Sequence, residues 1–302
     1  MHPLSIWLKI SVILGVAYGL NVHPTYPSWA VIMVLVAAFL LVPIGYQQFT
    51  HRYNYLFETN KILTWHLPAT LFLAVSFLLD AGLLAGLLAL PYFLWCLTIV
   101  LRALFPIQFS LKYLCGIVTW GFLTNAATWL VFDRFDFQPF DFSPWIVLLT
   151  GAHFHYAGFA LMASLSLLFS DNPNNFLVKT TIWCVIMGVV LTATGITTTQ
   201  LGLTHFIETI AAVSMALSGV LSGFVFIKFS FKEKGVTQKL WLLGGFCLFL
   251  GMILAFCYAI RPIYPLPILS IPFMQAVHGS LNALGFGTLT LVGFGLKKRK
   301  SL

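Results

Sequence analysis

Residues 67–104 read LPATLFLAVSFLLDAGLLAGLLALPYFLWCLTIVLRAL, and Asp80 and Arg102 are the only charged residues among them. A helix needs about 20 apolar residues to cross the hydrocarbon core of a bilayer, so this stretch is long enough for two crossings. Pro91 is its main interruption, so we expect the two crossings to form a tight hairpin or a partly re-entrant pair there. The stretch predicts a membrane protein built from helices.

The whole chain has the same apolar character. Of its 302 residues, 60% are hydrophobic and 8% are charged. A soluble domain carries about 25% charged residues, so this chain has too little polar surface to face water. In hydrocarbon every backbone N–H and C=O group needs a partner within the protein, and a helix provides these partners within one continuous apolar run. The runs lack the alternation of apolar and polar residues that is typical of a barrel strand. We predict an all-α, polytopic transmembrane bundle that forms a single domain over residues 1–302 and has the lipid bilayer as its main partner.

Apolar runs bounded by charge, proline or turn-forming residues mark about ten membrane spans. We place them at residues 4–21, 28–44, 68–89, 91–106, 111–131, 144–168, 179–198, 203–227, 240–260 and 270–295. The first run is also compatible with a cleaved signal peptide, because residues 10–20 follow Lys9 as an apolar core. Removing it would leave an odd number of spans, so we retain it as a helix.

The distribution of charge predicts how the spans are oriented. With a cytoplasmic N-terminus, 14 of the 16 Lys and Arg residues fall on the cytoplasmic side, and only Arg134 and Arg261 fall outside. The outer loop at residues 133–141 carries three aspartates instead. The positive-inside rule therefore places both termini in the cytoplasm. The basic residues 297–300 then face anionic lipid, so we do not interpret them as a nucleic-acid patch.

Tryptophans and cysteines give two further indications. Trp65 and Trp241 are among several tryptophans near predicted span ends, where an amphipathic ring suits the membrane interface. The five cysteines lie inside apolar runs without CxxC spacing, so they predict buried apolar residues, not disulfides or a thiolate metal site.

Polar residues inside the predicted spans are the functional candidates, because a polar or charged group is costly at membrane depth. Three spans enter from the outside, and their polar residues follow soon after entry. Asn125 is predicted at the same membrane depth, in a span that runs from the inside to the outside. We therefore expect these residues to converge in the outer half of one bundle: Asn125, His153, His155, His205, Glu208, His278 and Asn282.

Helical spacing limits which of these residues can act together. His205 and Glu208 are three residues apart, and His278 and Asn282 are four apart, so each pair is expected to share a face. His153 and His155 are two apart, which separates their side chains by about 200° on a regular helix. These two histidines therefore cannot bind one ion without a distorted backbone.

Three interpretations of this set remain open. The first is a membrane enzyme that uses a transition metal or haem and acts on a small or lipid-soluble substrate. Its ligands would be His153 or His155 with His205 and His278. Glu208 would be a ligand, would accept a hydrogen bond from a ligand or would act as general base. Asn125 and Asn282 would position the substrate.

The second interpretation is a secondary transporter in which Asp80, Glu208 and the histidines carry protons. The threonines between residues 192 and 199 would line its path, unless their hydroxyls only bond to the helix backbone. The third is a non-catalytic helper or assembly protein whose histidines and amides hydrogen-bond across helices and fix their packing.

Two short motifs carry a resemblance to a known family. Residues 153–159, HFHYAGF, and residues 277–282, VHGSLN, resemble the YndJ-like family of bacterial polytopic membrane proteins. The resemblance implies a multi-pass protein of a bacterial inner (cytoplasmic) membrane and makes His153, His155, His278 and Asn282 family-motif positions. It implies no particular activity, so it does not decide among the three interpretations.

Overall fold

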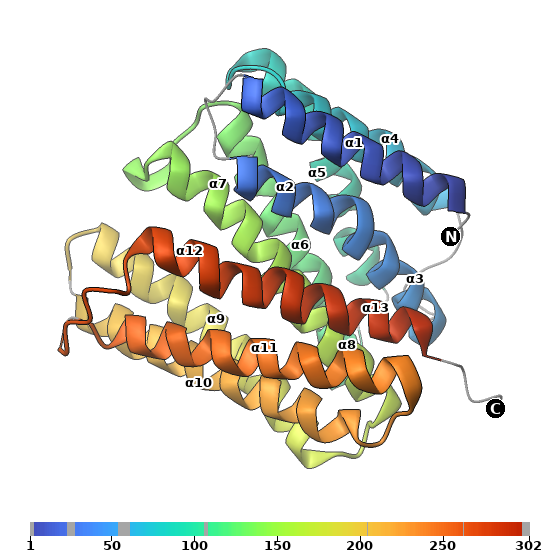
Figure 1. Cartoon of the computed structure of the whole chain (residues 1–302), viewed down its shortest axis with the longest axis vertical. Helices are drawn as coiled ribbons and strands as arrows, with labels where there is room; N and C mark the ends of the chain where they lie inside the picture. Colours follow the sequence, from blue (N-terminus) through green and yellow to red (C-terminus); the bar gives the residue numbers. More distant parts are fainter. Residues whose placement is uncertain are drawn as a thin grey trace. The chain divides into compact units, whose positions relative to one another are not determined.

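The computed structural model describes residues 3–22, 28–53, 61–105, 108–203, 205–261 and 263–297. Within these ranges every regular element is a helix and there is no strand (Figure 1). The prediction of an all-α fold is confirmed.

Some helices are uninterrupted, and others change to π-helical hydrogen bonding part-way along. The uninterrupted ones are α1 (Pro3–Val22), α4 (Lys61–Ser76), α5 (Leu83–Ala103), α6 (Leu111–Arg134), α9 (Phe176–Gln200), α10 (His205–Ser230) and α11 (Gly235–Ala259). In the described ranges, three long helices contain a π segment: α2 (Ser28–Val36), η1 (Ala37–Leu41) and α3 (Val42–Arg52); α7 (Pro144–His153), η3 (Phe154–Ala160) and α8 (Leu161–Asp171); and α12 (Ile271–Ser280), η4 (Leu281–Thr288) and α13 (Leu289–Leu296).

The helices account for the predicted spans. Among the described residues, 8 helices are long and apolar enough to cross a membrane. Two shorter apolar segments, Lys9–Gly19 and Ile62–Ser76, lie in the regions of the first and third predicted spans. The chain is therefore a multi-pass protein with roughly ten spans and a lipid environment.

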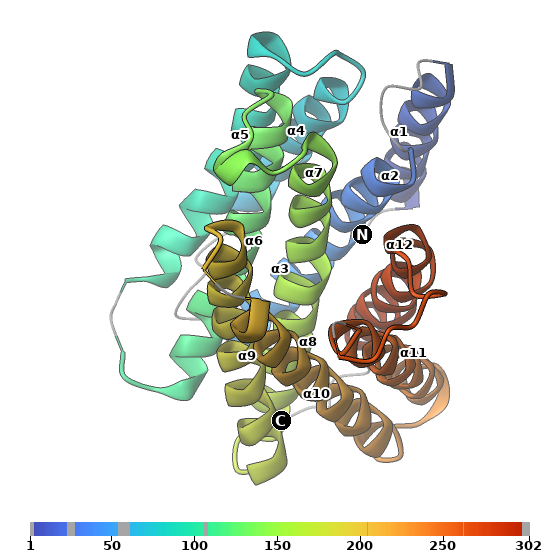
Figure 2. The ribbon, with the colours of Figure 1, turned by 90° about the vertical axis from the view of Figure 1, so that its left-hand side faces the viewer.

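The bend between the third and fourth spans is not where the sequence predicted it. Pro91 lies inside α5, and Pro68 lies inside α4. The chain turns between α4 and α5 instead, where Asp80 is exposed and Gly82 has a φ of 153°. Membrane helices tolerate proline, whereas that φ is accessible almost only to glycine. α4 and α5 then lie side by side as a hairpin (Figure 2).

The chain divides into two compact units, Met1–Ala160 and Leu161–Leu302. The boundary falls inside one membrane helix, where η3 passes into α8. Each unit has its own buried core, and each is described separately below. The single domain predicted over residues 1–302 stays a prediction.

Aromatic rings form the centre of the first unit. Trp120 of α6 is 0% exposed, and its indole contacts the rings of Tyr46, Phe49 and Phe159. Gly45 lies against the same Phe159 ring, and a Cβ there would lie 2.8 Å from it. The ring of Trp95 in α5 packs on Tyr46 from another direction. These contacts fix α3, α5, α6 and η3 to one another.

Glycines allow close packing in the second unit, where α10 and α11 are neighbours (Figure 1). A Cβ at Gly223 would lie 2.7 Å from the backbone nitrogen of Phe249, and one at Gly245 would lie 2.8 Å from that of Ile227. Small residues at both positions let the two backbones touch, as is common in membrane helix pairs. Trp241, near the start of α11, is 0% exposed, so its ring is enclosed by protein, and its place at the membrane interface stays a prediction.

A buried ion pair closes the C-terminal end of α6. Asp133 and Arg134 are 3% and 0% exposed, although the sequence placed both in an outer loop. Arg134 Nε is 2.7 Å from Asp133 Oδ2, and Nη1 donates to the carbonyl of Ser76 at 3.2 Å. The guanidinium also lies over the Phe77 ring, 4.9 Å from its centroid. Arg134 thus ties the bend after α4 to α6, which is why both charges are buried.

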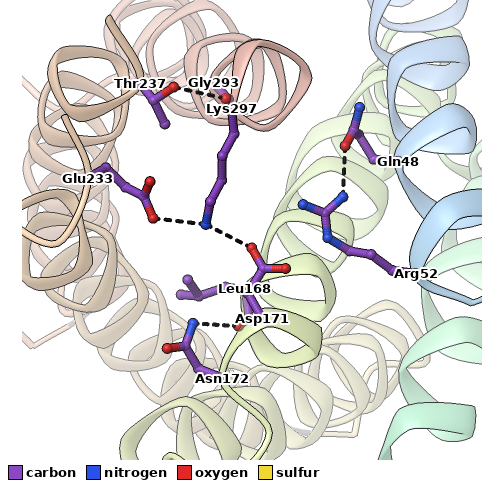
Figure 3. Close-up of polar contacts among 9 residues, drawn as sticks. All are labelled: Gln48, Arg52, Leu168, Asp171, Asn172, Glu233, Thr237, Gly293 and Lys297. Atoms are coloured by element: carbon purple, nitrogen blue, oxygen red, sulfur yellow. Dashed lines mark hydrogen bonds and ion pairs between the residues drawn. The ribbon is translucent and has the colours of Figure 1, made fainter. Parts of the chain in front are cut away.

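A second set of charges joins helix ends in the second unit (Figure 3). Lys297 Nζ, just after α13, is 2.9 Å from Asp171 Oδ2 and 2.8 Å from Glu233 Oε1. Asp171 ends α8, and Glu233 lies between α10 and α11. The same ammonium lies 5.1 Å from the centroid of the Trp241 ring. We call Asp171, Glu233 and Lys297 the lysine clamp.

Candidate functional site

His155 lies near the start of η3 in the first unit, and its side chain is fully buried. Its Nδ1 is 2.7 Å from the carbonyl oxygen of Gly151, and its Nε2 is 3.0 Å from the hydroxyl oxygen of Tyr92. A carbonyl oxygen only accepts hydrogen bonds, so Nδ1 carries the proton and donates it. Nε2 then accepts the Tyr92 O–H. Both ring nitrogens of His155 are therefore engaged by protein groups.

Tyr92 is a partner that the sequence analysis missed. It follows Pro91 in α5 and is 1% exposed. A tyrosine inside an apolar span usually needs a hydrogen-bond partner for its hydroxyl. The position of Tyr92 within such a span was therefore the sequence signal that could have indicated a polar partner. Tyr156 in η3 makes a comparable contact, since its hydroxyl donates to the Met33 carbonyl of α2 at 2.8 Å. Two tyrosine hydroxyls thus join η3 to α2 and α5.

His278 and Asn282 form a second pair, in the second unit. Nδ1 of His278 is 2.8 Å from the Gly251 carbonyl oxygen of α11, and Nε2 is 3.0 Å from Nδ2 of Asn282. The carbonyl fixes the proton on Nδ1, so Nε2 accepts from the amide. The prediction that these two side chains share a face is confirmed. Here too both ring nitrogens are engaged.

Gly251 leaves the space that this pair needs. A Cβ at that position would lie 2.6 Å from Asn282 Oδ1, so any larger residue would displace the amide. This oxygen is buried and has no hydrogen-bond partner within the described ranges. An unsatisfied buried acceptor of this kind costs about 1–3 kcal/mol in stability.

The other predicted residues take different positions. His153 ends α7 and is exposed while His155 is buried, as their two-residue spacing predicted. Asn125 is half-buried in α6. Glu208 is half-buried in the first turn of α10, where a carboxylate is stabilised by the positive end of the helix dipole. The side chain of His205 lies outside the described part of the chain.

Threonine hydroxyls in α9 bond to the helix backbone. Each donates to a carbonyl oxygen three or four residues earlier, at 2.8–3.0 Å, in Thr192, Thr194, Thr197 and Thr198. Such bonds satisfy a hydroxyl within its own helix. The backbone-bonding interpretation is confirmed for these four residues.

The predicted residues divide between the two units. The first unit holds Asn125, His153 and His155, and the second holds His205, Glu208, His278 and Asn282. Over the ranges that the structure describes, no three His, Cys, Asp or Glu side chains form a group able to hold a metal ion. The metal-ligand role of the histidines stays a prediction.

The family model described as YndJ-like protein matches residues 32–286. This range includes both histidine pairs, His155 with Tyr92 and His278 with Asn282. The chain belongs to the YndJ-like family. The resemblance inferred from residues 153–159 and 277–282 is therefore confirmed. In the YndJ-like chain described here, the two motifs supply His155, His278 and Asn282, whose rings and amide are buried or half-buried between helices.

A curated relative has the same family name. The Bacillus subtilis (strain 168) protein called uncharacterized membrane protein YndJ is 26% identical over 196 residues. The match covers 64% of this chain and 33% of the relative, so the chain spans about a third of that protein's length. No solved structure matches the chain. The YndJ-like relative thus agrees with a membrane location and names no reaction or substrate.

Proposed function

We propose that this protein is a non-catalytic membrane protein, a helper or assembly component, in which the buried histidines join helices. One observation carries the proposal: both ring nitrogens of His155 and of His278 are already hydrogen-bonded to protein groups. The helper interpretation predicts that each buried histidine is satisfied by groups of the protein itself. An interhelical hydrogen bond of this kind contributes about 0.6–2 kcal/mol to membrane protein stability.

The same observation weighs against the enzyme interpretation. A metal or haem iron binds the lone pair of a neutral imidazole nitrogen. In His155 and His278 the only lone pair on the ring accepts a hydrogen bond, from Tyr92 and Asn282 respectively. Binding a metal would require each ring to give up that bond. Under the enzyme alternative, Glu208 would keep its role as base or ligand, and Asn125 and Asn282 would position substrate.

The test is elemental analysis and a visible absorption spectrum of the detergent-purified protein, beside a His155→Ala, His278→Ala double variant. We expect both samples to lack stoichiometric metal and a Soret band, and the variant to melt several degrees lower. A His153→Ala variant is the control, because this side chain is exposed and should lower the melting temperature less than the double variant does. Stoichiometric metal or haem that disappears in the double variant would overturn the proposal and favour an enzyme.

A proton-coupled transporter is the second candidate, favoured by the π segments. His155 lies in η3, Asn282 lies in η4, and His278 lies just before η4. π-helical turns occur often at functional sites, and transporters place their ion sites where a helix is irregular. Proton uptake into proteoliposomes under an imposed potential tests this candidate. Uptake that is lost in His155→Ala and His278→Ala but kept in His153→Ala would favour transport over the helper function.

A further inference from the structure

A groove runs along the outside of the first unit between α4 and α5. It encloses about 580 Å³ and is lined by Trp65, Pro68 and Phe72 of α4 and by Pro91, Trp95 and Arg102 of α5, among others. Apart from Thr98 and Arg102, its lining is made of apolar and aromatic side chains. None of its lining residues belongs to the His155–Tyr92 pair or to the His278–Asn282 pair.

The groove has the length of one bilayer leaflet. On α4 its lining extends from Ile62 to Phe72, which corresponds to about 15 Å of helix. The hydrocarbon core of a bilayer is about 30 Å thick, so one leaflet is about 15 Å. Trp65, 72% exposed near the start of α4, has the character of a residue at the membrane border.

The positive charge of Arg102 at one end of the groove indicates which kind of molecule binds there. Arg102 lies in the last turn of α5 and is exposed. In the part of the chain that the structure describes, no Asp or Glu forms an ion pair with it. By the predicted orientation this end of the groove is cytoplasmic, where the leaflet is rich in anionic lipid. A guanidinium matches a phosphate group in both shape and charge.

We propose that the groove between α4 and α5 binds one anionic phospholipid of the cytoplasmic leaflet. An acyl chain lies between Trp65 and Pro91, and the phosphate group bonds to Arg102. The prolines favour this site because a proline inside a helix bends it and opens space beside a neighbouring helix. A phospholipid fits this groove because its acyl chain matches the apolar lining, which is as long as one leaflet, and its phosphate group matches the positive charge at the end.

Native mass spectrometry of the detergent-purified protein tests the proposal, with equal amounts of phosphatidylglycerol and phosphatidylcholine added. We expect one phosphatidylglycerol to be retained in preference to phosphatidylcholine. Arg102→Gln should reduce that preference about fivefold, the effect of one basic side chain near an anionic surface. Thr98→Phe places a ring into the groove from an exposed position, so it should remove the retained lipid of either headgroup.

Lys228→Gln is the matched control, because Lys228 is also an exposed cation in the last turn of a helix but lies in the second unit. It should leave the preference for phosphatidylglycerol unchanged. An equal loss in Lys228→Gln and Arg102→Gln would mean that lipid is held only by general surface charge, and the site would be rejected. Unchanged retention in both Arg102→Gln and Thr98→Phe would also reject it. The melting temperature of each variant shows that it is folded.

Discussion

At the scale of single residues, two side chains far apart in sequence satisfy each other inside the membrane. The Tyr92 hydroxyl and the His155 ring are 3.0 Å apart and are both buried. Replacing either one leaves a polar group without its partner in an apolar environment, which costs more than the bond itself contributes. The energetic coupling between the two is therefore measurable.

A double-mutant cycle of Tyr92→Phe and His155→Leu measures this coupling. We expect an interaction energy of about 0.5–1.5 kcal/mol in the free energy of unfolding, in the range found for membrane hydrogen bonds. Equilibrium unfolding in mixed detergent gives the four values. The same cycle of Tyr92→Phe with His153→Ala should be additive, because His153 is exposed. Additivity in both cycles would contradict the assigned bond.

Breaking the Asp133–Arg134 ion pair should lower the free energy of unfolding by more than the Tyr92–His155 hydrogen bond contributes. Arg134→Leu leaves the buried Asp133 carboxylate without its cation, and we expect a loss of about 3–5 kcal/mol in the free energy of unfolding. The double variant Asp133→Leu, Arg134→Leu should recover part of that loss, because it buries no charge. Thermal unfolding of both variants in detergent checks this prediction. A double variant less stable than the single one would contradict it.

At the scale of helices, the backbone contact between α10 and α11 depends on glycine. A Cβ at Gly245 meets backbone atoms of α10 at 2.8–2.9 Å, and backbone cannot move aside as a side chain can. We expect Gly245→Ala to lower the free energy of unfolding by about 1–3 kcal/mol through overpacking. Gly121 of α6 is the control, because a Cβ there meets nothing within 4 Å. Gly121→Ala should be neutral or stabilising, since alanine favours helix; an equal loss at both positions would contradict the packing argument.

The helices were predictable from sequence because a span needs only a sufficient number of consecutive apolar residues. The bend after α4 was misplaced because proline normally ends a helix, whereas Pro68 and Pro91 both lie within helices here. The shared face of His278 and Asn282 followed from local spacing. The partners Tyr92 and Gly251 did not, because their contacts join helices distant in sequence, and no periodicity encodes such pairing.

At the scale of the whole molecule, the orientation of the chain in the membrane stays a prediction that cysteine labelling can test. Gln138, in the loop after α6, and Lys234, between α10 and α11, are both exposed. In a background lacking the native cysteines, a membrane-impermeant maleimide should label Gln138→Cys in intact cells. It should label Lys234→Cys only after the membrane is opened. The reverse pattern would place both termini outside.

The lysine clamp has a consequence for the order in which the protein is made. Lys297 is synthesised about 60 residues after Glu233, and later still than Asp171. At about 5–20 residues per second, the ribosome needs about 3–12 s to cover that interval. During these seconds the Lys297 ammonium is not yet available to Asp171 and Glu233. The clamp therefore forms only after α13 and Lys297 have been translated, so α8 and the segment between α10 and α11 are joined through it late in the synthesis of the second unit.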